Sequence, residues 1–88
     1  MFQSFILKSN MLNQYKVSLV DNCSSNVTRL FDLIPDKSVS TKKSLYEAAL
    51  KGLGLDEPVE DFYSSDYGTR YVLRNKYLMF SIVIEQNP

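Results

Sequence analysis

The stretch RYVLRNKYLMFSIVIEQNP, Arg70 to Pro88, decides the fold that we expect for this chain. Two runs rich in apolar and β-branched residues flank Asn75, a residue type that tolerates the left-handed turn conformation. The pattern predicts a β-hairpin whose arms are Gly68–Arg74 and Lys76–Glu85. The second arm is largely apolar on both faces, with Leu78, Phe80, Ile82 and Ile84 on one face and Tyr77, Met79, Ser81 and Val83 on the other.

A strand that is apolar on both faces is usually found inside a sheet. The sequence nevertheless ends soon after this strand, so we expect Tyr77–Glu85 to form an open edge that another element must cover. The cover is either the apolar segment Phe2–Leu7, the same strand of a second copy in a homodimer, or a strand or helix from a protein partner.

The sequence before the hairpin predicts one strand and two helices. Apolar and polar residues alternate in Gln14–Val20, which is typical of a half-buried strand. Over Val27–Ile34 the apolar residues recur at i, i+3, i+4 and i+7, which predicts a short helix that ends before Pro35. A second helix is predicted over Thr41–Leu53, with Gly52 and Gly54 in the position of a C-terminal stop.

These elements predict an α+β fold in a single domain, residues 1–88. A small antiparallel sheet is built from Tyr15–Val20 and the C-terminal hairpin, and a two-helix hairpin packs on one of its faces in the order β-α-α-β-β. Residues 14–85 form the core of the domain, and residues 1–12 are either an extra N-terminal strand or an arm. The residues expected to share one hydrophobic core are Val17, Leu19, Leu45, Ala49, Leu53, Phe80 and Ile82.

Five acidic residues lie within DEPVEDFYSSD, residues 56–66, with no basic residue among them. The simplest interpretation is a solvated loop. The alternative is a local counter-charge over a basic face, because the ten basic residues of the chain then stand against only five acidic residues elsewhere.

Composition narrows the classes of function. A hydrophobic fraction of 44% and a charged fraction of 23% are typical of a globular protein. Ten basic residues balance ten acidic ones, so the chain lacks the positive field of most nucleic-acid binders, and we expect no nucleic-acid partner. No apolar run approaches the ~20 residues of a membrane span, and no basic n-region precedes the apolar start, so we expect a cytoplasmic location.

The residue types offer little catalytic chemistry. The chain has no histidine, which removes the commonest metal ligand and general base, and the single Cys23 has no partner for an internal disulfide. No glycine-rich phosphate loop, paired carboxylates or metal-ligand spacing is present. We therefore expect no cofactor, no metal and no catalytic residue, although acid–base chemistry by Tyr, Lys and Glu leaves the question of an enzyme open.

Cations and aromatic residues alternate around the hairpin. A cross-strand pattern on a solvent-facing sheet explains them without any function. A protein-binding patch is the functional alternative, since Tyr and Arg are favoured anchors of interfaces, and an RNA site is a third interpretation. Tyr67 belongs to the same cluster, and the residues predicted to bind a partner are Arg70, Tyr71, Arg74, Lys76 and Tyr77.

The chain resembles the RelE/ParE superfamily of toxins from toxin–antitoxin systems. QYKVSLVDNCSSNVTRLFDLI (14–34) is similar to the opening strand and first helix of the family, and LYEAALKGLGLDEP (45–58) to its second helix. GTRYVLRNKYLMFSIVIE (68–85) resembles its hairpin, in which an Arg-bearing strand turns into a Tyr-led strand. The family's RNA-cleaving members carry an Arg and a Tyr on that strand, and the matching positions here are Leu78 and Ser81.

The resemblance implies a small cytoplasmic toxin on the ParE side of the superfamily, whose members bind and inhibit DNA gyrase. Such a protein acts by protein binding and is neutralised by an antitoxin, so an antitoxin or an inhibited target is the expected partner. Two alternatives stay open. One is an RNA-cleaving toxin of the RelE type, and the other is an inhibitor or immunity-type protein-binding module unrelated to toxins.

Overall fold

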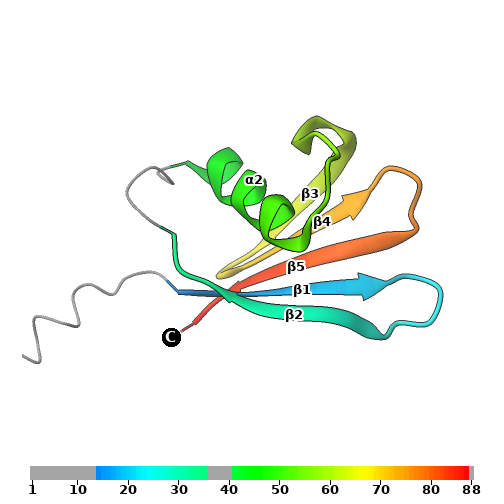
Figure 1. Cartoon of the computed structure of the whole chain (residues 1–88), viewed down its shortest axis with the longest axis horizontal. Coiled ribbons are helices and arrows are strands. Elements are labelled where there is room, and N and C mark those ends of the chain that lie inside the picture. The colour runs from blue at the N-terminus through cyan, green and yellow to red at the C-terminus, as the bar shows by residue number, and fades with distance from the viewer. Residues whose placement is uncertain (1–13, 36–40, 88) are drawn as a thin grey trace, which may run out of the picture.

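The computed structural model describes residues 14–35 and 41–87, and it consists of a five-stranded antiparallel sheet with one α-helix on one of its faces (Figure 1). The strands lie in the order β2-β1-β5-β4-β3. The segments Phe2–Leu7 and 1–12, for which we predicted a strand or an arm, lie outside the described residues. The elements are β1 (Tyr15–Asp21), β2 (Val27–Leu33), α2 (Lys42–Leu53), the 3₁₀ helix η1 (Val59–Asp61), β3 (Phe62–Tyr67), β4 (Arg70–Asn75) and β5 (Phe80–Gln86).

The last strand lies in the middle of the sheet and not at its edge. β5 pairs with β1 on one side and with β4 on the other, both antiparallel. A hairpin of β4 and β5 is therefore confirmed, but its turn is formed by residues 76–79, which we predicted as strand, and Asn75, which we predicted as the turn, is the last residue of β4. The expected open edge at Tyr77–Glu85 is also wrong. The apolar character of both faces of this strand reflects its central place, and its backbone has no free edge through which a homodimer could form.

The predicted helix over Val27–Ile34 is wrong, because these residues form strand β2. Phe31 and Leu33 pack towards the core, while Leu30 and Asp32 point away from it. The apolar residues of this segment therefore fit the two-residue period of a strand as well as the spacing of a helix. The preceding turn favours the strand, since Asp21 accepts a hydrogen bond from the backbone N–H of Cys23 and reverses the chain. The predicted two-helix hairpin is thus replaced by a β-hairpin and one helix.

The second predicted helix is confirmed as α2. It begins with a capping box in which the hydroxyl of Thr41 accepts a hydrogen bond from the backbone N–H of Ser44 at 3.1 Å. It ends at Gly54, whose left-handed φ of 75° closes the last turn. Arg29 on β2 also caps this end, because its Nη1 donates to the carbonyl oxygen of Leu53 at 3.2 Å.

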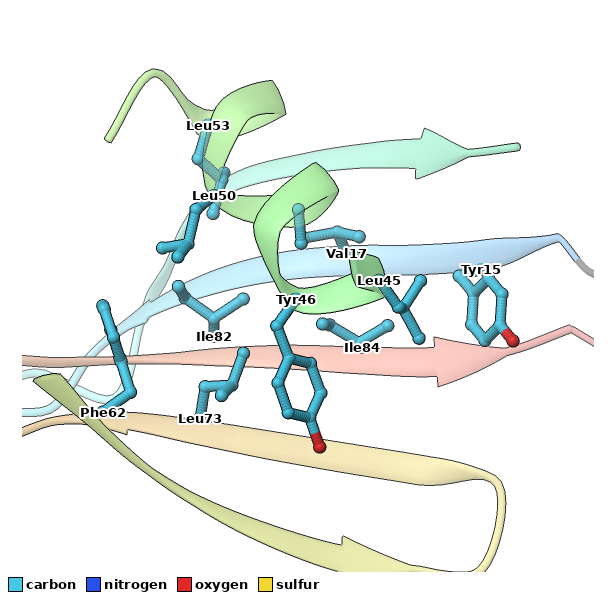
Figure 2. Packing of buried hydrophobic residues seen from close by; sticks show 11 residues of the cluster. Tyr15, Val17, Leu45, Tyr46, Leu50, Leu53, Phe62, Leu73, Ile82 and Ile84 are labelled. Atoms are coloured by element: carbon cyan, nitrogen blue, oxygen red, sulfur yellow. The ribbon is translucent and has the colours of Figure 1, made fainter. Parts of the chain in front are cut away.

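The hydrophobic core lies between α2 and the sheet (Figure 2). Val17, Ile82 and Ile84 supply the centre of the sheet surface and are fully buried. The predicted core is confirmed in its membership, with Leu19 and Phe80 partly buried at its margin. The α2 residues that cover it are Leu45, Tyr46, Ala49, Leu50 and Leu53.

The acidic segment is a solvated loop only in its first half, because its second half is strand β3. Its carboxylates pair with lysines from other elements, as the counter-charge interpretation anticipated. Asp66 pairs with Lys42, and Glu60 lies 2.8 Å from Lys43, so both lysines in the first turn of α2 have a carboxylate partner. These pairs are exposed and hold β3 and η1 against α2 with little net energy.

The longest described helix has 12 residues. No helix in the described ranges combines the length and the apolar character that crossing a bilayer requires.

Candidate functional site

The structure separates the five residues that we predicted to bind a partner. Arg70 and Arg74 lie on the sheet face opposite α2, each across from a β3 tyrosine, Tyr67 and Tyr63 respectively. Tyr71 lies on the other face, half-buried beneath α2. The predicted cluster is therefore divided by the sheet, with the two arginines on one face and Tyr71 on the other.

Lys76 and Tyr77 belong instead to the turn between β4 and β5. Lys76 Nζ lies 3.6 Å from the carboxylate of Asp61 and 5.7 Å from the centre of the Tyr77 ring. This turn leaves the sheet at the same end as the turn between β1 and β2 (Figure 1). Three consecutive large side chains project from it, which we call the apolar tip, namely Tyr77, Leu78 and Met79.

The backbone of the apolar tip is held by hydrogen bonds from two sides. Asn75, only 2% exposed, accepts at its side-chain oxygen from the N–H of Tyr77 (2.8 Å) and at its carbonyl from the N–H of Leu78 (2.8 Å). Asn22 in the opposite turn donates through its amide to the carbonyl of Leu78 (3.1 Å) and through its backbone to that of Met79 (3.1 Å). These hydrogen bonds hold the backbone of the turn in one conformation.

The two asparagines are themselves held in place. The side-chain amide of Asn75 donates to the carboxylate of Glu57 at 2.7 Å, and the hydroxyl of Ser81 donates to the side-chain oxygen of Asn22 at 2.8 Å. A chain of hydrogen bonds thus runs from the segment after α2, through the apolar tip, to the turn between β1 and β2. Such satisfied networks make a local structure rigid.

The side chains of the apolar tip do not take part in this network. Tyr77, Leu78 and Met79 are 71%, 58% and 64% exposed. Leu78 also has a left-handed φ of 60°, a conformation that costs a non-glycine residue about 1 kcal/mol or more. A strained backbone and three exposed apolar side chains are both unfavourable for the isolated fold, and residues of this kind gather at functional sites.

A mostly apolar pocket of about 380 Å³ lies beside the apolar tip. Met79 forms part of its wall, which continues the apolar surface from the tip towards β1 and β2. Cys23 is exposed and has no disulfide. The lining residues are Leu19, Asp21, Cys23, Thr28, Met79 and Phe80.

A second group of aromatic residues lies near the N-terminal end of α2. Tyr46 meets Tyr71 edge-on, with ring centres 6.2 Å apart, and Lys42 lies 5.3 Å from the centre of the Tyr71 ring. Burial, followed by the nearby Asp66 carboxylate, raises the pKa of Tyr46 above its ordinary value. The Tyr46 hydroxyl is buried without a hydrogen-bond partner of normal geometry, although Ser64 lies nearby. The cluster packs α2 on β4.

The residues of the acidic segment line an open cleft of about 440 Å³ next to the end of α2. Within the described ranges, no group of three or more His, Cys, Asp or Glu is arranged to hold a metal ion. The Glu60 carboxylate has a pKa below its ordinary value because Lys43 donates a hydrogen bond to it, so this acid is an ion-pair partner.

The sequence predicts the turn at Asn75 and places Leu78 and Met79 in the following strand, whereas both residues lie in the turn. Leu78 reads as an inward-facing strand residue, and a left-handed leucine has no signature in sequence because glycine or asparagine is the usual occupant. Comparisons with protein-family models, curated proteins and solved structures find no significant match. Membership of the RelE/ParE superfamily therefore stays a prediction from the sequence, and the two-helix fold that it implied is not formed.

Proposed function

We propose that this chain is a small protein-binding module whose apolar tip anchors it to a partner. The observation that carries the proposal is the combination found at Leu78. Its backbone is strained, its side chain is exposed, and hydrogen bonds from Asn75 and Asn22 fix its position. Interfaces are dominated by a few such large anchors presented on a preorganised backbone.

The pocket beside the tip supports the same function. Its apolar wall and its position next to Met79 suit a side chain inserted by the partner while Tyr77 and Leu78 lie against the partner's surface. The proposal keeps protein binding from our sequence analysis, together with the cytoplasmic location. It does not rest on the toxin resemblance, and action as a gyrase-type toxin stays a prediction.

Photo-crosslinking in cells of the source organism tests the proposal. A photo-reactive phenylalanine analogue placed at Tyr77 should form a covalent product with one discrete protein. The same analogue at Glu47, on the exposed side of α2, is the control and should give no such product. Crosslinks from position 77 to nucleic acid, the same products from both positions, or no product from position 77 would each overturn the proposal.

A further inference from the structure

The face of the sheet opposite α2 is a second surface, and it differs from the apolar tip because it carries charged side chains. No element of the described ranges covers it (Figure 1). The strand register arranges its side chains in three rows that cross all five strands. These rows, each listed from β2 to β3, are Asp32-Lys16-Glu85-Arg70-Tyr67, then Leu30-Ser18-Val83-Val72-Ser65, and finally Val27-Val20-Ser81-Arg74-Tyr63.

The charges on this face are not all neutralised within the chain. Lys16 Nζ lies 3.8 Å from Asp32 Oδ1, so these two charges form an ion pair within the chain. Arg70 and Arg74 make no ion pair, hydrogen bond or ring contact with any described residue. Glu85 likewise makes no ion pair with a described residue. The two guanidinium groups are available to an anionic partner.

The pattern of signs favours a protein over a nucleic acid. Glu85 stands beside Arg70 in the same row, and Asp32 closes that row at the edge of the sheet. A phosphate backbone crossing the face would meet these carboxylates, whereas a protein surface can match alternating charges one by one. Tyr63 and Tyr67, both more than half exposed, flank the arginines and are favoured interface residues.

The middle row of side chains determines which partner element can pack on this face. Its side chains are small or β-branched, namely Ser18, Ser65, Val72 and Val83, with the exposed Leu30 at one end. An antiparallel sheet can leave one face to solvent, and the apolar stripe of a helix is one of the elements that cover such a face through its apolar residues. Arg70 and Arg74 are four residues apart on β4, which separates their backbones by about 13 Å. Carboxylates two helical turns apart are separated by about 11–12 Å, so one helix could reach both arginines.

We infer that the uncovered face of the sheet binds an amphipathic helix of a protein partner, with an apolar stripe on Val72 and Val83 and two carboxylates, two turns apart, on Arg70 and Arg74. The surface is separate from the apolar tip, and the inference does not depend on the function proposed for that tip. It adds a second contact site to a chain of 88 residues.

A peptide selection tests this inference. The bait is the whole chain carrying Leu78→Gly, which removes the main anchor of the apolar tip, and the library displays helix-forming peptides of about 16 residues, or roughly four turns. We expect the enriched peptides to carry Asp or Glu seven or eight positions apart beside an apolar stripe. Fluorescence anisotropy then measures their Kd for the wild-type chain and its variants.

The Arg70→Glu/Arg74→Glu variant should bind the enriched peptides at least about tenfold more weakly, and it should bind peptides better when their acids are replaced by Lys. Lys51→Glu, an exposed charge change on α2, is the control and should leave the Kd unchanged. Circular dichroism confirms that each variant is folded. The inference is wrong if no helical peptide is enriched, or if the double variant binds the peptides as the wild type does. Binding of a single-stranded oligouridine that the double variant loses would show that the face takes RNA instead.

Discussion

Two of the residues that the structure describes adopt a left-handed backbone without being glycine, and they differ in what their side chains do. Ser25 lies in the turn between β1 and β2, and Leu78 lies in the turn between β4 and β5. A small polar side chain at such a position needs no explanation beyond the turn. A leucine at such a position loses about as much conformational free energy as the serine does, and it also exposes an apolar side chain. Its presence therefore points to an interaction outside the chain.

The hydroxyl of Tyr46 is the other residue-scale anomaly, since it is buried without a partner. We expect Tyr46→Phe to leave the free energy of unfolding at pH 7 unchanged or to raise it by up to about 1 kcal/mol, because the substitution removes an unsatisfied polar group. Urea denaturation measures this directly. A loss of more than about 1 kcal/mol would show that the hydroxyl makes a stabilising hydrogen bond.

The same residue predicts a pH dependence. Its pKa in the folded protein is raised by burial, so above pH ~10 the unfolded chain releases a proton that the folded chain retains. The stability linked to Tyr46 is therefore complete below pH ~10 and is lost as the pH rises through the folded-state pKa. Tyr46→Phe should flatten this alkaline loss of stability. Part of the loss should persist, because burial also raises the pKa of Tyr15.

At the scale of elements, β2 and α2 are held together by a contact that depends on one glycine. A Cβ atom at Gly52 would lie 2.6 Å from the ring of Phe31. Gly52→Ala alone should therefore gain little or lose stability, although alanine favours a helix by about 1 kcal/mol. In a chain that already carries Phe31→Ala, the same substitution should stabilise by roughly that amount. Equal effects of Gly52→Ala in both backgrounds, measured by urea denaturation, would show that the two elements do not touch as described.

β1 and α2 were predictable because every local sequence signal in each of them favours the same structure. Alternation over β1, and the Thr41 and Gly54 caps around α2, point to one structure each. Val27–Leu33 is different, because Val27, Leu30 and Phe31 fit a helical stripe while Phe31 and Leu33 fit a strand. The choice is made by pairing with β1, which is a tertiary contact that the segment itself does not encode. The candidate site was predictable only in part for the same reason, since the sheet register decides that Tyr71 and Arg70 face opposite sides.

At the scale of the whole molecule, the central place of β5 accounts for the apolar character of its two faces. This strand closes the sheet by joining the β1–β2 hairpin to the β3–β4 hairpin. We predict that the amides of β5 exchange with solvent more slowly than those of the edge strands β2 and β3, because both neighbours of β5 must separate before its hydrogen bonds open. Hydrogen exchange followed by NMR checks this order. Exchange in β5 as fast as in β2 would contradict the strand order.

The central claim is that the apolar tip keeps a strained leucine because it binds a protein. The most direct test measures stability and partner affinity together for Leu78→Gly, with Ser25→Gly as the matched control in the neighbouring turn. Both variants relieve a left-handed backbone, so both should gain up to about 1 kcal/mol in the free energy of unfolding. Only Leu78→Gly should weaken binding of the partner identified by crosslinking, by about tenfold or more. A Leu78→Gly chain that binds this partner as tightly as the wild type, or an equal loss of affinity in Ser25→Gly, would contradict the claim.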